Sequence, residues 1–229
     1  MTEREQFLRA FHDAQPGITS RAFGRAGSYA RLAAKVPQGR VLDLACGDGT
    51  LLQLLPDAVG LDLSLQELRR ARGAVCGRAQ QLPFRERSFA AVTCHLAFML
   101  FDDVAAVVGE LARVLKPGAP FIALLGGGPT ADGDDAFHRF AALVPRGQRF
   151  GDPRASHEAG WHELFAGWRD ISFERWPLDL GGSFDEVWRF LASSYQLRDA
   201  EAIRNELRAA YPGDHVPCTV VTFCATARR

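Results

Sequence analysis

The chain has 229 residues, which suffices for one domain with a lid or an insertion, and its 27 basic and 27 acidic residues give zero net charge. A neutral chain has no basic excess for phosphate backbones, so we expect no nucleic acid as substrate. No apolar run reaches the length of a membrane span and no signal-peptide pattern is present. We therefore expect a cytoplasmic protein without a membrane partner. The five cysteines form no C-x-x-C pair, and we expect no metal site.

Two helices are predicted ahead of the first strand, over residues 3–14 and 28–36. Phe7, Leu8 and Phe11 share one side of the first helix, and the pair Pro16-Gly17 follows it as a break. Neither helix belongs to a strand–helix unit of the core.

Residues 39–126 alternate regularly between strand and helix patterns. This alternation predicts an α/β fold with a parallel, doubly wound sheet and helices on both faces. Two later segments, 170–180 and 218–227, alternate in the manner of strands. The predicted strands of the core are 40–45, 58–62, 73–77, 89–95 and 119–125, and the predicted helices are 50–55, 65–71, 103–115 and 157–166.

A glycine turn after the first strand predicts a binding site for a cofactor that contains adenosine. Gly47 and Gly49 permit positive φ and let a ligand approach the backbone. Ligands of open α/β sheets bind at this carboxyl end of the strands. Asp62 ends the next strand, where a carboxylate can accept both ribose hydroxyls. The alternative is that Asp62 only caps the helix that begins near Ser64.

The details of the turn favour S-adenosylmethionine over a dinucleotide. The dinucleotide fingerprint needs a third glycine, and Leu52 stands there instead. Asp43, an acid within the strand, is unusual beside a pyrophosphate. The cationic amine of S-adenosylmethionine is a better partner for it.

The turn resembles the first motif of class I S-adenosylmethionine-dependent methyltransferases of the small-molecule type 11/25-like group, with Ala45 where a first glycine is common. Two later runs, 77–84 and 110–118, resemble the adenine-side loop of that family and its turn before the fifth strand. The resemblance implies a Rossmann-like, seven-stranded, mostly parallel sheet with a reversed last strand. It also implies a helical lid over residues 1–38 and a methyltransferase core over residues 39–229.

The same resemblance implies a set of cofactor-binding residues. One departure concerns the adenine-side loop, where Arg78 replaces an acid that accepts from the adenine amino group. Arginine only donates, so Gln80, Gln81, the backbone or water would have to accept instead. Tyr29 would lie over the sulfonium through a cation–π contact, or else only pack beneath the lid. The implied residues are Tyr29, Asp43, Ala45, Cys46, Gly47, Asp62, Leu63, Ala79, Gln80, Gln81 and His95.

Two stretches exceed a minimal sheet, at about 126–156 and 183–212, after the fifth and sixth strands. The first begins with the glycines of 126–129, which we expect to act as a hinge. The second carries aromatic residues that include Trp188 and Tyr195. We expect both stretches to form the substrate pocket, although these aromatic residues also suit simple packing on the sheet.

Methyl transfer requires alignment and exclusion of water, with a base only where the acceptor must lose a proton. Histidine titrates near neutral pH, and His95 and His12 are the candidate catalytic residues. His95 follows the fourth strand, where it would touch the cofactor or act as the base, unless it only packs under the loop.

These patterns predict methyl transfer to an oxygen or nitrogen of a small-molecule acceptor, in specialised metabolite biosynthesis, by a monomer or homodimer. The alternative of another class is a non-catalytic protein that binds S-adenosylmethionine or S-adenosylhomocysteine as a sensor or partner subunit. A nicotinamide-dependent oxidoreductase is a third hypothesis, and the missing third glycine argues against it.

Overall fold

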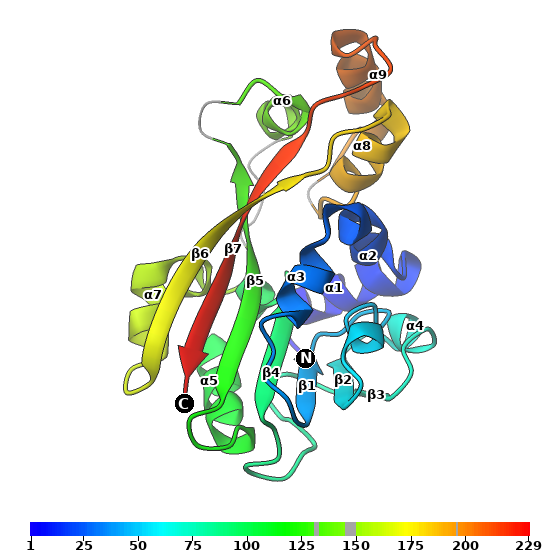
Figure 1. Cartoon of the computed structure of the whole chain (residues 1–229). Coiled ribbons are helices and arrows are strands. Elements are labelled where there is room, and N and C mark those ends of the chain that lie inside the picture. Colours follow the sequence, from blue (N-terminus) through cyan, green and yellow to red (C-terminus); the bar gives the residue numbers. More distant parts are fainter. Residues whose placement is uncertain (131–132, 145–149, 196) are drawn as a thin grey trace.

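A single sheet organises the computed structural model, which describes residues 1–130, 133–144, 150–195 and 197–229 (Figure 1). Within these ranges seven strands follow the order β3-β2-β1-β4-β5-β7-β6. β7 runs antiparallel to both strands beside it, and the other pairs are parallel. The strands are β1 (Val41–Leu44), β2 (Ala58–Asp62), β3 (Ala74–Cys76), β4 (Ala91–His95), β5 (Pro120–Pro129), β6 (Arg169–Asp179) and β7 (Thr219–Arg228). The predicted seven-stranded α/β fold with a reversed last strand is confirmed.

Helices cover both faces of this sheet. Their bounds are α1 (Glu3–Ala14), α2 (Ile18–Phe23), α3 (Ser28–Ala33), α4 (Leu65–Leu68), α5 (Val104–Val114), α6 (Ala136–Leu143), α7 (Glu158–Leu164), α8 (Phe184–Leu191) and α9 (Ala200–Ala210), with short 3₁₀ turns at Gly24–Ala26, Leu52–Leu54, Phe98–Leu100 and Pro153–Ser156. None of these described helices is long and apolar enough to cross a membrane.

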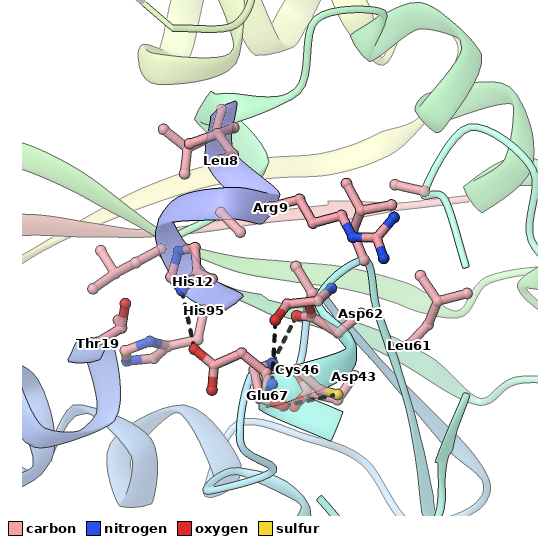
Figure 2. A pocket seen from close by; sticks show the side chains of 18 of the residues that line it. Leu8, Arg9, His12, Thr19, Asp43, Cys46, Leu61, Asp62, Glu67 and His95 are labelled. Atoms are coloured by element: carbon pink, nitrogen blue, oxygen red, sulfur yellow. Dashed lines mark hydrogen bonds and ion pairs between the residues drawn. The ribbon is translucent and has the colours of Figure 1, made fainter. Parts of the chain in front are cut away.

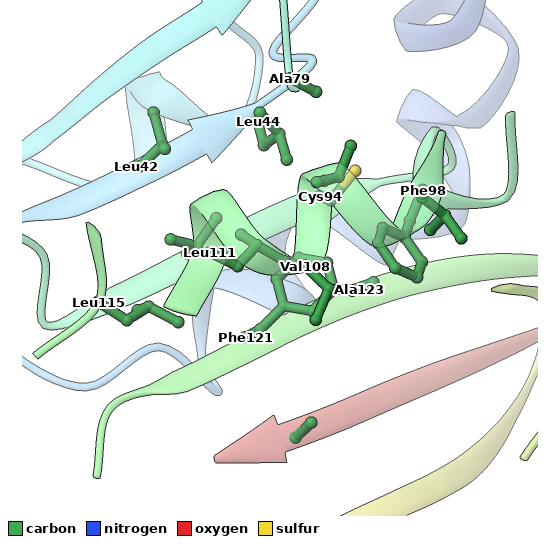
Figure 3. Close-up of a cluster of buried hydrophobic side chains, with 14 of the residues drawn as sticks. Leu42, Leu44, Ala79, Cys94, Phe98, Val108, Leu111, Leu115, Phe121 and Ala123 are labelled. Carbon is green, nitrogen blue, oxygen red and sulfur yellow. The ribbon is translucent and has the colours of Figure 1, made fainter. Parts of the chain in front are cut away.

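The strand pattern divides the core into two layers. Along β5, Phe121, Ala123 and Leu125 belong to the cluster that packs under α5 and α7, part of which Figure 3 shows. The alternate residues Ile122 and Leu124 belong to the cluster on the other face, together with residues of α2, α3, α6, α8 and α9. Successive side chains of a strand point to opposite faces, so a continuous apolar run is what a sheet covered on both sides requires.

The predicted helix over 50–55 is wrong in extent. Only Leu52–Leu54 forms a 3₁₀ turn, and Leu55 is already extended. Gly49 has φ of +80° and Pro56 follows Leu55, so too few residues remain between them for a stable α-helix. The helix α2 at Ile18–Phe23 was not predicted, because Pro16-Gly17 indicated a break but not the short helix that begins directly after it.

The expected glycine hinge at 126–129 is also wrong. β5 continues to Pro129 and pairs with β7 through a register shift between Gly126 and Gly128. A Cβ on Gly127 would lie 2.6 Å from Cε2 of Phe223. The glycine therefore allows close packing of β5 against an aromatic ring of β7, and the segment is a bulged strand.

The two stretches that exceed a minimal sheet pack against each other. Phe137 of α6 meets Phe190 of α8 edge-on at 5.1 Å, and Tyr211 after α9 donates to the carbonyl of Asp134 at 2.9 Å. Figure 1 shows α6, α8 and α9 gathered at the same end of the sheet. Residues 131–132, 145–149 and 196 of these stretches lie outside the described residues.

Candidate functional site

A pocket of about 1100 Å³, its mouth included, opens at the carboxyl ends of the first four strands (Figure 2). The loops after β1, β2, β3 and β4 line one side of it. The leading helices α1, α2 and α3 and the single residue Tyr195 line the rest. The pocket therefore lies where a doubly wound sheet binds its ligands.

The glycine turn forms the floor of the pocket. Ala45 and Gly47 have φ of +56° and +55°, in the left-handed region. A Cβ built on Gly47 would have no neighbour closer than Glu67 Oε2 at 4.0 Å, whereas one on Gly49 would lie 3.0 Å from the backbone of Ala71. Gly47 therefore leaves open space for a ligand, and Gly49 allows tight packing of the turn.

Asp62 is fixed at the end of β2 by two backbone amides. Gly47 N donates to its Oδ2 and Ser64 N to its Oδ1, each at 2.8 Å. Burial raises the pKa of this carboxyl group, and the two hydrogen bonds oppose the rise. Each carboxylate oxygen has a second lone pair, so Asp62 can accept from a ligand while it supports the turn.

Asp43 lies deeper, with 1% of its surface exposed. Thr93 Oγ1 donates to its Oδ1 at 3.0 Å, and no ion pair to it occurs in the described part of the chain. Burial raises the pKa of this carboxyl to about 7. A buried carboxylate that lacks an ion-pair partner in the protein is a suitable partner for a ligand ammonium.

His95 and Tyr29 form a stacked pair beside the turn. Their ring centroids are 3.9 Å apart with 14° between the planes. His95 Nε2 lies 3.0 Å from Ser28 Oγ, while its Nδ1 has no hydrogen-bond partner among the described residues. Burial lowers the pKa of His95 to about 3, so its ring is neutral at pH 7.

His12 of α1 contacts Tyr195, from the expected substrate stretch, and Glu67, which the sequence did not identify as functional. Its Nδ1 lies 3.0 Å from Glu67 Oε1, and its Nε2 lies 2.9 Å from the hydroxyl of Tyr195. Gly17 N donates to the other oxygen of Glu67 at 2.7 Å, and 3% of the Glu67 side chain is exposed. In the tautomer that donates Nδ1–H to Glu67, His12 Nε2 accepts a hydrogen bond from the Tyr195 hydroxyl. Tyr195 lay in the stretch expected to form the substrate pocket, but nothing in the sequence distinguished Glu67 from an ordinary surface acid.

Of the residues implied by the sequence, Tyr29, Asp43, Ala45, Cys46, Gly47, Asp62, Leu63, Ala79, Gln80, His95 and His12 line the pocket. Gln81 does not line it and is exposed, because it turns back to pair with Arg78 in a bridge at the loop surface. The structure thus brings together these residues from six separate segments of the chain.

Comparison with known proteins agrees with this geometry. A family model described as a methyltransferase domain matches residues 42–123. The demethylmenaquinone methyltransferase of Symbiobacterium thermophilum is 36% identical over 38% of this chain and 43% of that protein. The chain contains a class I S-adenosylmethionine-dependent methyltransferase domain.

Solved structures extend the likeness of the methyltransferase domain to its fold. The YcgJ protein of Bacillus subtilis has a TM-score of 0.58 and 20% identity, over 90% of this chain and 98% of its own. Phosphoethanolamine N-methyltransferase 2 of Haemonchus contortus, in complex with S-adenosyl-L-methionine, has a TM-score of 0.60 and 16% identity, over 100% of this chain and 60% of its own. S-adenosylmethionine is the cofactor that this fold family uses.

The methyltransferase match covers one side of the pocket. Residues 42–123 contain the glycine turn, Asp62 and His95, but neither α1 to α3 nor the segment that carries Tyr195. The matched region spans less than half of the length of the Symbiobacterium relative. The likeness therefore concerns the side of the pocket that the loops after the strands form.

Proposed function

We propose that the protein transfers a methyl group from S-adenosylmethionine to an oxygen or nitrogen atom of a small-molecule acceptor. The observation that carries this proposal is that Asp43 and Asp62 line one pocket with the open glycine turn at Gly47. One acid is suited to an ammonium group and the other to ribose hydroxyls. The pocket extends beyond these residues to α1 and Tyr195, where an acceptor would lie beside such a ligand.

The residues present fit this cofactor. Asp43 would bind the amine, because a cation favours the ionised form of a buried carboxylate. Asp62 would accept from the ribose, and the stacked rings of Tyr29 and His95 offer an aromatic face for the sulfonium. The remaining proposed contacts are Ala45, Cys46, Gly47, Leu63, Ala79 and Gln80, and Gln81 is left out because it lies outside the pocket. S-adenosylmethionine, when bound, supplies the activated methyl group.

His12 is the better of the two candidate bases. The pKa of about 3 makes His95 a weak proton acceptor, so we assign it to positioning beside Tyr29. His12 is connected to Glu67 on one nitrogen and to the Tyr195 hydroxyl on the other. Tyr195 lines the pocket and can take the proton of an acceptor hydroxyl while it passes its own to His12. An acceptor that carries a removable proton suits this chain of contacts.

The leading residues 1–38 are proposed as the lid of the site, since α1, α2 and α3 all contribute side chains to the pocket. A lid of this kind excludes water from the transfer. The acceptor would lie against α1 and Tyr195. We further propose that the protein acts in the cytoplasm on a metabolite of a specialised pathway, without nucleic acid or membrane, as a monomer or homodimer.

A second candidate acceptor is a demethylated quinone, which the name of the Symbiobacterium relative favours. A second candidate function is cofactor binding without transfer, which the Arg78 departure at the adenine-side loop favours. Both candidates use the same cofactor as the first proposal. The first has a different acceptor, and the second has none.

One experiment separates these candidates. The purified protein is titrated calorimetrically with S-adenosylmethionine, S-adenosylhomocysteine and NADH, and then incubated with phenols, alcohols, amines and a demethylated quinone under mass spectrometry. Micromolar binding of the sulfur ligands and methylation of a hydroxyl or amine are expected. Methylation of the quinone ring alone would favour the quinone acceptor, and binding without any product would favour the sensor. Binding of NADH alone would overturn all three.

A further inference from the structure

Arg78 lies in the adenine-side loop, and the structure gives it a partner on α1. Its Nη2 lies 2.8 Å from Oε1 and 2.9 Å from Oε2 of Glu5. Both residues line the pocket, and Glu5 is the one buried residue of α1, with 8% of its surface exposed. Position 78 itself has no carboxylate, but Glu5 brings one to this loop from α1, 73 residues earlier in the chain.

We propose that Glu5 supplies the hydrogen-bond acceptor for the adenine amino group of the cofactor, and that Arg78 holds Glu5 in place for this role. The inference rests on the proposed cofactor. An exocyclic amino group needs an acceptor, which a guanidinium cannot be. Arg78 and Glu5 together therefore take over the function of the single acid that related loops carry.

Glu5 has the capacity for this contact. Its Oε2 accepts from Thr2 N at 2.9 Å and from Arg78, while Arg78 is the one donor to Oε1 among the described residues. A carboxylate offers about four lone-pair sites, so Oε1 can accept another hydrogen bond. The charged pair also strengthens a hydrogen bond from a ligand donor.

Arg78 also has an unpaired hydrogen-bond donor. Its Nε is buried and has no hydrogen-bond partner in the described part of the chain. The ring nitrogens of adenine are acceptors of the kind that such an N–H group lacks. The loop therefore has an unpaired donor on Arg78 near the acceptor on Glu5, which suits the ring-nitrogen acceptors and the amino donor of adenine.

The first turn of α1 is built to keep Glu5 in position. Thr2 Oγ1 accepts from Glu5 N at 3.1 Å and completes a capping box with the Glu5 side chain. Thr2 and Arg4 also contact Asp102, in the loop before α5. Because the turn is anchored to two loops of the core, adenine recognition requires α1 to be docked.

Calorimetry with two ligands tests this inference. The ligands are S-adenosylhomocysteine and its analogue with hydrogen in place of the 6-amino group. In the wild type the first should bind roughly tenfold more tightly, the scale of one hydrogen bond to a charged group. Glu5→Ala should remove this preference by weakening S-adenosylhomocysteine alone. The double variant Glu5→Ala with Arg78→Asp returns an acid to the loop and should restore the preference.

Glu3→Ala is the matched control, because Glu3 is an exposed acid in the same helical turn. It should leave both affinities unchanged. Equal weakening of both ligands by Glu5→Ala would mean that Glu5 only docks α1, and the inference would be wrong. If Glu5→Ala still prefers S-adenosylhomocysteine, another residue accepts from the adenine amino group, and Gln80 is the next candidate. Failure of the wild type to bind either ligand would overturn the proposed function itself, which separates the two failures.

Discussion

At the scale of single residues, three carboxylates of one pocket are held in three different ways. Asp43 has a single hydroxyl donor, Asp62 has two backbone amides, and Glu67 has an imidazole and an amide. Hydrogen bonds stabilise the ionised form and burial opposes it. The same side-chain chemistry thus serves three separate purposes, and each can be tested by substitution.

Asp62→Ala should weaken the binding of S-adenosylhomocysteine by about 2–3 kcal/mol, because charged hydrogen bonds to the ribose are lost. Calorimetry gives the affinity directly. Asp57→Ala, an exposed acid just before the same strand, is the matched control and should change nothing. An unchanged affinity in the Asp62 variant would exclude the ribose assignment.

Gly47→Val should abolish cofactor binding, because its side chain would enter the open space at the turn. Gly118→Val is a close control. Gly118 also has positive φ, +76° against +55°, and no atom lies within 4 Å of the position that a Cβ would take, but it lies outside the pocket. Both variants should lose a similar amount of stability in thermal denaturation, and only the Gly47 variant should lose binding. Retained binding would show that the ligand lies elsewhere.

Asp43 should make the stability of the ligand-free protein depend on pH. Its pKa rises from 3.8 to about 7 on folding, so between these values the folded protein keeps a proton that the unfolded chain has lost. The stabilising contribution is complete below pH 3.8 and is lost as the pH rises towards 7, by up to about 1.4 kcal/mol per pH unit. Asp43→Asn removes it. In urea denaturation, the free energy of unfolding of the variant should therefore rise relative to that of the wild type as the pH rises from 4 to 7. Parallel pH curves would contradict the assignment.

At the scale of elements, α1 differs from the helices of the core in what holds it. Glu5 is its one buried residue, and polar contacts with the core hold the helix, together with the aromatic contacts of Phe7 with Phe150 and of Phe11 with Tyr195. Asp13 accepts from Ser64 Oγ at 2.6 Å and from Gln66 N at 3.2 Å, and His12 reaches Glu67. Such contacts are individually weak in water, so α1 depends on its surroundings more than an apolar helix does.

Binding of S-adenosylhomocysteine should therefore slow amide hydrogen exchange in α1. A ligand in the pocket adds contacts to α1 and so lowers the population of the open form. Exchange followed by mass spectrometry should show added protection for residues 3–14. The peptide of α9, Ala200–Ala210, lines no part of the pocket and should be unaffected. Equal exchange in α1 with and without ligand would remove the case for a lid.

At the scale of the whole molecule, the aromatic cluster under α7 stabilises the fold, whereas the pocket lies at the carboxyl ends of β1 to β4. Trp161 is fully buried, stacks on Phe121 at 5.6 Å and packs on Phe165 at 4.7 Å. Its Nε1 donates to the carbonyl of Ala155 at 2.9 Å. None of these residues lines the pocket. Substitution of Trp161 should consequently change stability without changing binding.

Trp161→Ala should lower the free energy of unfolding by about 3–5 kcal/mol, the usual range for removal of a large buried aromatic side chain. Urea denaturation measures the loss. Trp168→Ala, at the half-buried rim of the same cluster, should cost less. The affinity of folded Trp161→Ala for S-adenosylhomocysteine should match that of the wild type, and a large drop would show that the two regions are coupled.

The patterns in the amino-acid sequence predicted a parallel α/β sheet with a ligand pocket at its carboxyl edge, and the resemblance to class I methyltransferases implied seven strands with the last one reversed. Apolar runs, glycine spacing and the acid at the end of β2 are local signals, and local backbone preferences turn each of them into a strand or a turn. Where such signals were ambiguous the prediction failed. The glycines at 126–129 indicated a hinge, yet pairing with β7 and the ring of Phe223 made them a bulged strand.

Which side chains meet over the pocket depends on tertiary packing. Glu5 meets Arg78 across 73 residues and His12 meets Tyr195 across 183, because α1 folds back over the sheet edge. No periodicity or spacing encodes such a meeting, since it depends on how a polar helix docks on distant loops. The pocket residues at the strand edge are therefore readable in the sequence, whereas the contacts among the residues that cover the pocket form only in the folded chain.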